Sequence, residues 1–151
     1  MKEQKETIST INSLTETLKD GQEGFRQAAE GVKDPQLKSL FNQYSQQRAR
    51  FSTELQKQAQ SLGESEPETD SSAAGGLHRT WSNLKSAVTQ GDDHAILAEC
   101  ERGEDSAVEE YKKALDDNLS VPLRDIVSLQ YAEVKNAHDH IKSVRDAAKS
   151  S

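Results

Sequence analysis

The sequence predicts an all-α protein built as an antiparallel four-helix bundle with one short additional helix. Apolar residues recur every three or four positions in four long stretches, which is the period of an amphipathic helix. Helix-starting and helix-ending residues separate these stretches. The composition, with 32% hydrophobic and 30% charged residues, suits helices that each bury one stripe. A length of 151 residues fits a single domain.

The first helix is expected at residues 6–30, with an apolar stripe that runs from Ile8 to Val32. Gly21 lies on this stripe, where glycine costs a helix about 1 kcal/mol relative to alanine. We therefore expect a neighbouring helix or a bulky side chain to approach closely at Gly21. Gly31 is expected to end the helix by adopting a left-handed conformation.

The second helix is expected at residues 35–62. Asp34 can accept hydrogen bonds from the free N–H groups of its first turn, and Pro35 at the first helical position loses no bond. Gly63 should end it. The short link to the first helix predicts an antiparallel hairpin.

A loop and a short helix are expected to connect this hairpin to the next. Residues 63–76 have a loop composition, and a helix is expected at 77–89. Trp81 lies on the apolar face of that helix and should anchor the connection to the bundle.

Two more long helices are expected at residues 93–117 and 121–148. Asp92 and Asp93 suit a helix start, and Ser120 can cap the last helix. Two helix pairs joined by one long crossover describe the ferritin-like topology.

Four stretches carry a resemblance to a bacterial family of four-helix-bundle proteins, catalogued as a domain of unknown function within the ferritin-like superfamily. They are KDGQEGFRQAAEGVKDPQLKSLF, QQRARFSTEL, LHRTWSNLKSAVTQGDDHAILAECERGED and YAEVKNAHDHI. ECERGED and AEVKNAHD are the most specific parts. The resemblance covers nearly the whole chain and implies the fold, but no activity.

Ferritin-like metalloproteins hold two metal ions with a Glu on two helices and Glu-x-x-His on the other two. The third helix resembles the related pattern as Glu104-x-x-Ala107-x-x-x-Tyr111, and the fourth keeps His138. The remaining ligand positions are occupied by Leu18, Gln47, Arg50 and Lys135. A slip of one residue would bring in Glu23, Asp105 or Glu133, which lean away from the apolar stripes.

With one carboxylate and one imidazole left, the interior has too few anionic oxygens for a pair of dications. The sequence therefore predicts no di-iron or di-manganese centre and no cofactor. A single-metal site that uses Glu104 and His138 is the alternative.

Glu104 lies near the apolar stripe of its helix, where a carboxylate is costly to bury without a partner. We expect it to form an ion pair with Arg48 or Arg50. Such a polar layer can fix the register of the helices at some cost in stability. The other expected members of this network are Gln47, His138, Tyr44 and Tyr131.

The other residues of this stretch are expected to have ordinary structural roles. Glu99, Glu101, Glu109 and Glu110 are expected on a solvated face. Cys100 should face inward as a small apolar filler.

Bulk properties exclude several function classes. A net charge of -7 disfavours binding to nucleic acid or to an anionic membrane. The start MKEQKETIST has no apolar segment of a secretory signal, and no run approaches the ~20 apolar residues of a membrane span. The single Cys suggests a reducing compartment, so we expect a cytoplasmic protein.

No phosphate-binding loop, nucleophile elbow or CxxC motif is present, so an enzyme is the less favoured reading. The sequence favours a non-catalytic bundle with a stress-related or interaction role. The alternative is a ferritin-like protein that binds iron or manganese in its core. A homodimer or a protein partner is also expected, through Trp81 or through Ile8 and Ile11.

Overall fold

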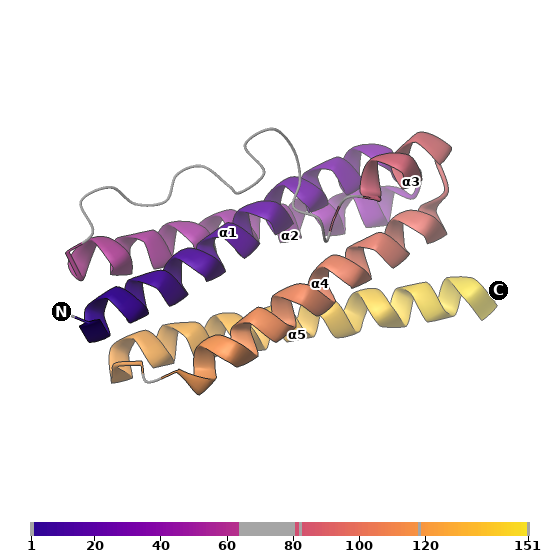
Figure 1. Cartoon of the computed structure of the whole chain (residues 1–151). Helices are drawn as coiled ribbons and strands as arrows, with labels where there is room; N and C mark the ends of the chain where they lie inside the picture. Colours follow the sequence, from indigo (N-terminus) through magenta and orange to yellow (C-terminus); the bar gives the residue numbers. More distant parts are fainter. Residues whose placement is uncertain (1, 64–80, 82, 118, 151) are drawn as a thin grey trace.

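In a computed structural model, the part of the chain that is described comprises residues 2–63, 81, 83–117 and 119–150, and it folds into helices without strands. These are α1 (Lys2–Gly31), α2 (Pro35–Ser61), α3 (Leu84–Gln90), α4 (Asp93–Asp116) and α5 (Val121–Ser150). Two long hairpins, α1 with α2 and α4 with α5, lie against each other, and the termini are at opposite ends of the bundle (Figure 1). The prediction of an all-α bundle is confirmed.

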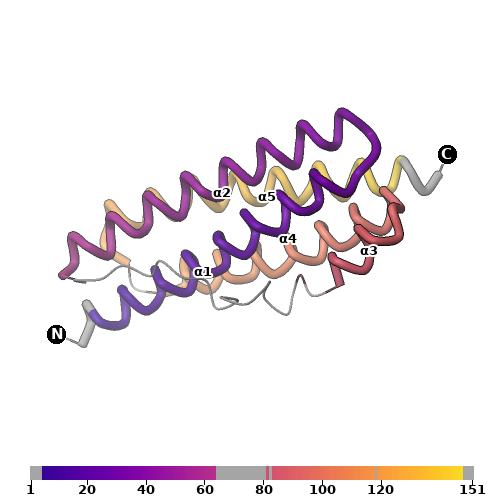
Figure 2. The backbone as a smooth tube through the Cα atoms, turned by 90° about the horizontal axis from the view of Figure 1, so that it is seen from above, coloured from indigo at the N-terminus to yellow at the C-terminus, as the bar shows by residue number. Residues whose placement is uncertain are grey.

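The two hairpins are related by a single long crossover. Helix α2 ends at the end of the bundle opposite to the start of α4, as both views show (Figures 1 and 2). Helix α3 lies beside the first turns of α4 and packs on α1 and α4. The helix expected at residues 77–89 is observed from Leu84 to Gln90, and residues 77–80 lie outside the described part.

Aspartates cap two helix starts. The carboxylate of Asp34 accepts a hydrogen bond of 2.9 Å from the backbone N–H of Gln36. In the same way Asp92 accepts one of 3.0 Å from the N–H of His94. Each bond satisfies one of the N–H groups that a first helical turn leaves free.

Asp93 ties the second hairpin to the first. Its two carboxylate oxygens accept hydrogen bonds from the backbone N–H groups of Lys33 and Asp34, at 2.9 and 3.1 Å. The loop between α1 and α2 is thereby held against the start of α4.

Position 31, the last residue of α1, is glycine for a different reason than the sequence suggested. Among the described glycines only Gly63 and Gly91 have positive φ, at 105° and 69°, so the expected left-handed conformation at Gly31 is wrong. A Cβ at position 31 would come within 2.8 Å of both methyl carbons of Val88. Glycine is required at this position by the packing of α3.

The apolar core consists of two clusters that follow each other along the bundle. The first, here called the α3-side cluster, contains Phe25, Ala28, Ala29, Val32, Leu37, Phe41, Trp81, Leu84, Ala87, Ile96, Leu97, Cys100 and Ile141. The second, here called the N-terminal cluster, contains Ile11, Leu14, Leu18, Leu55, Ala59, Ala107, Tyr111, Ala114, Leu119, Leu123, Val127 and Val134. Each long helix contributes to both clusters. Most of the buried polar residues fall between the clusters in sequence, namely Asp20, Arg48, Ser52, Glu101 and Glu104.

No helix in the described part of the chain is long and apolar enough to cross a membrane.

A buried arginine–glutamate pair at the centre of the bundle

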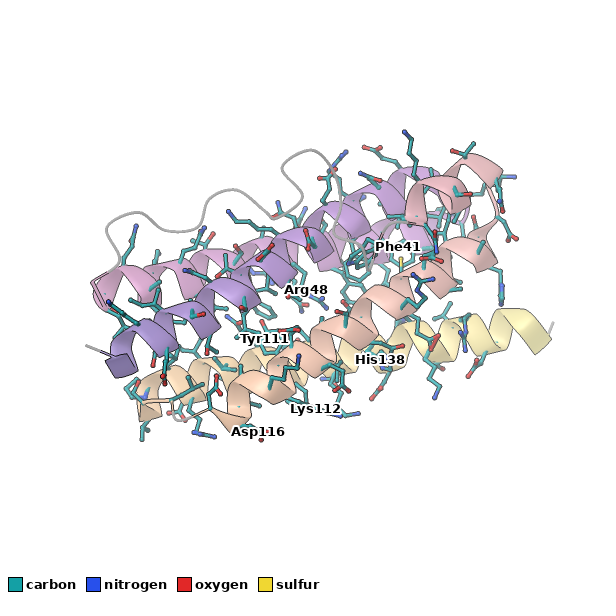
Figure 3. The ribbon with its side chains drawn as sticks, viewed as in Figure 1. Phe41, Arg48, Tyr111, Lys112, Asp116 and His138 are labelled. Carbon is teal, nitrogen blue, oxygen red and sulfur yellow. The ribbon has the colours of Figure 1, made fainter. Side chains whose placement is uncertain are left out.

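Arg48 of α2 and Glu104 of α4 meet in the interior, between the two apolar clusters. Both side chains are 1% exposed. The Arg48 guanidinium donates to both carboxylate oxygens, through Nη1 to Oε1 and through Nη2 to Oε2 at 2.8 Å. Figure 3 shows Arg48 in the space between the two hairpins, close to Tyr111. The two parallel hydrogen bonds of a bidentate pair fix the relative orientation of its members and strengthen their interaction.

Gly21 of α1 lies beside the side chain of Arg48. A Cβ on Gly21 would lie 3.6 Å from Cγ of Arg48, so the glycine lies directly against the arginine stem. One turn further along α1, the guanidinium carbon lies 5.3 Å from the ring centroid of Phe25. The bulky side chain that the sequence predicted near Gly21 is therefore Arg48.

Arg48 keeps its charge in this buried place. Burial by itself lowers the pKa of Arg48, but the charge and the hydrogen bonds of Glu104 outweigh it, so the pKa of Arg48 is raised. Burial and the neighbouring Glu104 raise the pKa of Tyr44 to about 12. The pKa of the Cys100 thiol is also raised, first by burial and then by Glu104 and Glu99, so this thiol stays protonated.

A second chain of hydrogen bonds runs from the interior to the surface on the N-terminal side of this layer. Tyr111, fully buried on α4, donates a hydrogen bond of 2.7 Å to Oε1 of Gln130 on α5. The amide nitrogen of Gln130 then donates to Glu54 of α2 at 2.8 Å. Three helices are linked in this way. Sequence reasoning did not place Gln130 in the network, although its position on the apolar stripe of α5 marked it as a buried amide.

Gln47 belongs to the same region, as expected. Its side-chain oxygen accepts a hydrogen bond of 3.2 Å from Nε of Arg48. Its amide nitrogen reaches Glu133 of α5 at 3.4 Å. Gln47 therefore connects the buried pair to the surface between α2 and α5.

Three of the expected residues, Arg50, Tyr131 and His138, do not contact the pair of Arg48 and Glu104. Arg50 is exposed on α2, because two positions from Arg48 a helix has turned by more than half a revolution. Tyr131 is half-buried and packs beside the N-terminal cluster.

His138 bonds to Asp105 and Asp139 at 2.5 and 3.0 Å, at the side of the α4–α5 interface. The expectation that Arg50, Tyr131 and His138 join Glu104 is wrong.

The acidic stretch of α4 is less solvated than expected. Glu101 is only 8% exposed and forms an ion pair of 2.5 Å with Arg145 of α5. The Glu99 side chain is 14% exposed and lies 3.4 Å from Arg102. The prediction of a solvated face fails for these two residues, and for Glu101 the cause is coverage by Arg145 of α5.

The residues at the metal-ligand positions of ferritin-like proteins do not fit a metal centre. Leu18 is a buried hydrocarbon at 1% exposure, whereas Lys135 and Arg50 are exposed cations. Both oxygens of the remaining carboxylate, Glu104, are bonded to Arg48. Within the described part of the chain, no three His, Cys, Asp or Glu side chains gather closely enough to hold a metal ion.

Residues 6–117 match the family described as Domain of unknown function (DUF2383). This chain belongs to that family. The match covers the first hairpin, the crossover and α4, so it includes Arg48, Trp81 and Glu104.

A solved structure of a Mycobacterium smegmatis Dps1 mutant is similar to this member of the family. Its TM-score is 0.73, with 13% sequence identity, and the alignment covers 95% of this chain and 97% of that chain. At this identity the likeness shows the fold alone, which is the ferritin-like helical bundle. No curated protein matches this chain.

Proposed function

We propose that this protein is a non-catalytic ferritin-like bundle in which a polar network stands in place of a metal site. The observation that carries the proposal is the bidentate pair of Arg48 and Glu104, which supplies one buried cation to one buried carboxylate. A dication at the same carboxylate would be repelled by the guanidinium.

The chemistry of the neighbouring positions supports the same proposal. A metal centre of this fold family needs several anionic oxygens that converge on two ions. Here the inward positions of α1 and α2 carry Leu18 and the amide of Gln47, which bring no charge.

Measurement of bound metal tests the proposal. The full chain is purified without added metal, and its iron and manganese are measured by mass spectrometry, before and after incubation with Fe²⁺ or Mn²⁺. We expect far less than one ion per chain. One or more tightly held ions per chain, lost in Glu104→Gln, would instead establish the metalloprotein alternative.

The variant Arg48→Met sharpens this test, because it frees both oxygens of Glu104 without adding a ligand. We expect its metal content to stay below one ion per chain. Arg50→Met is the matched control, since it removes an exposed arginine from the same helix.

We further propose that the role of the bundle is to interact with another protein or with a second copy of itself, in a bacterial cytoplasm and in a stress-related setting. The net charge of -7 argues against nucleic acid as the partner. Trp81 and Ile11 are 3% and 1% exposed, so of the three residues that the sequence suggested for the contact only the half-buried Ile8 is open to a partner. Light scattering of the purified chain tests self-association: a dimer mass supports it, and a mass equal to one chain removes it.

A further inference from the structure

Trp81 inserts between α1 and α4 at a place made for it by two glycines. A Cβ on Gly24 would lie 2.5 Å from the indole ring, and one on Gly103 would lie 2.2 Å from it. The indole also meets Phe25 edge to face, with centroids 5.4 Å apart. Trp81 is 3% exposed, so the slot holds nearly the whole side chain.

Helix α3 continues the same contact. Leu84 and Ala87 are 0% and 6% exposed in the α3-side cluster, and Val88 covers Gly31. We call Trp81 and α3 together the strap. In the described residues no hydrogen bond or ion pair joins the strap to a long helix. Its hydrogen bonds, such as Thr89 to Lys85 and Ala87 to Asn83, are local.

The long helices are linked to each other differently. Arg48 with Glu104 joins α2 to α4, and Glu101 with Arg145 joins α4 to α5. These links and the N-terminal cluster do not involve the strap. Helix α3, by contrast, has seven residues, and its Asn83 cap makes no side-chain hydrogen bond. A helix this short is not stable without its packing.

Trp81 also separates two environments. On one side lies a cavity of about 160 Å³ between α1 and α4, lined by Trp81, Gly103 and the polar side chains of Glu16, Thr17 and Asp20. On the other side lies the apolar α3-side cluster. Departure of the indole would join the polar cavity to that cluster.

We propose that the strap detaches reversibly as one unit while the four long helices stay packed, and that Trp81 is the gate between the cavity and the α3-side cluster. The contacts of the strap with the long helices are apolar among the described residues, and they are held by one short helix, which favours local detachment of the strap. The proposal does not depend on the proposed function.

Denaturant titration of the full chain tests it, because Trp81 is the only tryptophan. Quenching of Trp81 fluorescence by acrylamide reports on the strap, and far-UV circular dichroism reports on the long helices. We expect the indole to become accessible at a clearly lower urea concentration than that at which the helices melt. Coincident transitions would overturn the proposal.

Two buried leucines provide matched variants. Leu84→Ala removes an apolar contact of the strap, and Leu14→Ala removes one from the N-terminal cluster; both leucines are at most 1% exposed. Leu84→Ala should increase the quenching of Trp81 in the native state at least tenfold, with a smaller change in the helix transition. Leu14→Ala should shift the helix transition and leave native-state quenching near its original value. Equal effects of the two variants on both signals would overturn the proposal. If either variant fails to fold, the titration of the wild-type protein decides the question.

Discussion

The guanidinium of Arg48 and the carboxylate of Glu104 face each other across the middle of the bundle, with each side chain only 1% exposed to solvent. Their position separates an apolar cluster that includes Phe25 and Cys100 from one that includes Leu14 and Tyr111. Because a displaced α4 would leave both charges buried and unpaired, this pair specifies the register of α2 against α4.

Removal of one partner of this pair should be far more damaging than removal of both. Arg48→Met leaves the Glu104 carboxylate buried without compensation, which should lower the free energy of unfolding by about 3–5 kcal/mol. The double variant Arg48→Met with Glu104→Leu should recover most of that loss. Urea unfolding of the two single variants and the double variant gives the coupling energy.

The exposed neighbour supplies the control for this experiment. Arg50→Met should change the free energy of unfolding by no more than about 0.5 kcal/mol. A double variant as unstable as Arg48→Met alone would contradict the role assigned to the pair.

Two glycines on neighbouring helices should respond to alanine in opposite ways. Gly103→Ala places a methyl group against the Trp81 ring and should destabilise the protein by about 1–3 kcal/mol. Gly21→Ala meets Arg48 at 3.6 Å, an ordinary contact, and should be neutral or stabilising by up to about 1 kcal/mol because alanine favours the helix. Thermal unfolding of both variants measures the difference, and a stabilising Gly103→Ala would refute the tight fit of the indole.

His138 should make the stability of the α4–α5 hairpin depend on pH. Burial lowers its pKa, but hydrogen bonds with Asp139 and Asp105 outweigh burial, so its folded-state pKa is raised. A raised pKa stabilises the fold fully below the unfolded pKa of about 6.5, and this contribution disappears as the pH rises through the folded pKa. His138→Gln should therefore be more damaging at about pH 5 than at about pH 9.

The size of this pH effect is limited, because both aspartates are exposed to solvent. We expect a difference in melting temperature of at most about 3 °C between the two conditions. His140→Gln, an exposed position on the same helix, should show no such difference. A His138→Gln variant that loses equal stability at both pH values would exclude the ionic role.

The hydrogen bond of Tyr111 to Gln130 should contribute measurably to stability. Tyr111→Phe leaves the buried oxygen of Gln130 without its donor, at a cost of about 1–3 kcal/mol. Tyr44→Phe removes a half-buried hydroxyl that has no hydrogen bond among the described residues, so its effect should be smaller. Chemical unfolding of the two variants compares their losses of stability. A larger loss in Tyr44→Phe than in Tyr111→Phe would contradict the prediction.

Part of the central site could be predicted before the structure. The place of Glu104 on the stripe of its helix indicated a buried carboxylate with an arginine partner, Arg48 or Arg50. The sequence could not decide between Arg48 and Arg50, because the choice depends on how α2 is rotated about its axis relative to α4. The same uncertainty misplaced His138, whose ring lies beside Asp105 rather than Glu104.

The sequence by itself determined the helices, their order, the single crossover and the scarcity of inward carboxylates, since these follow from the 3.6-residue period and from residue type. Only the tertiary structure decided that Arg48 holds Glu104, that Arg145 covers Glu101, and that Gly24 and Gly103 form a slot for Trp81. The physical reason is that the period of one helix defines its buried face but not its rotation or axial shift against the next. Those two quantities are set by how all the side chains of the core fit together, and they determine which polar groups meet.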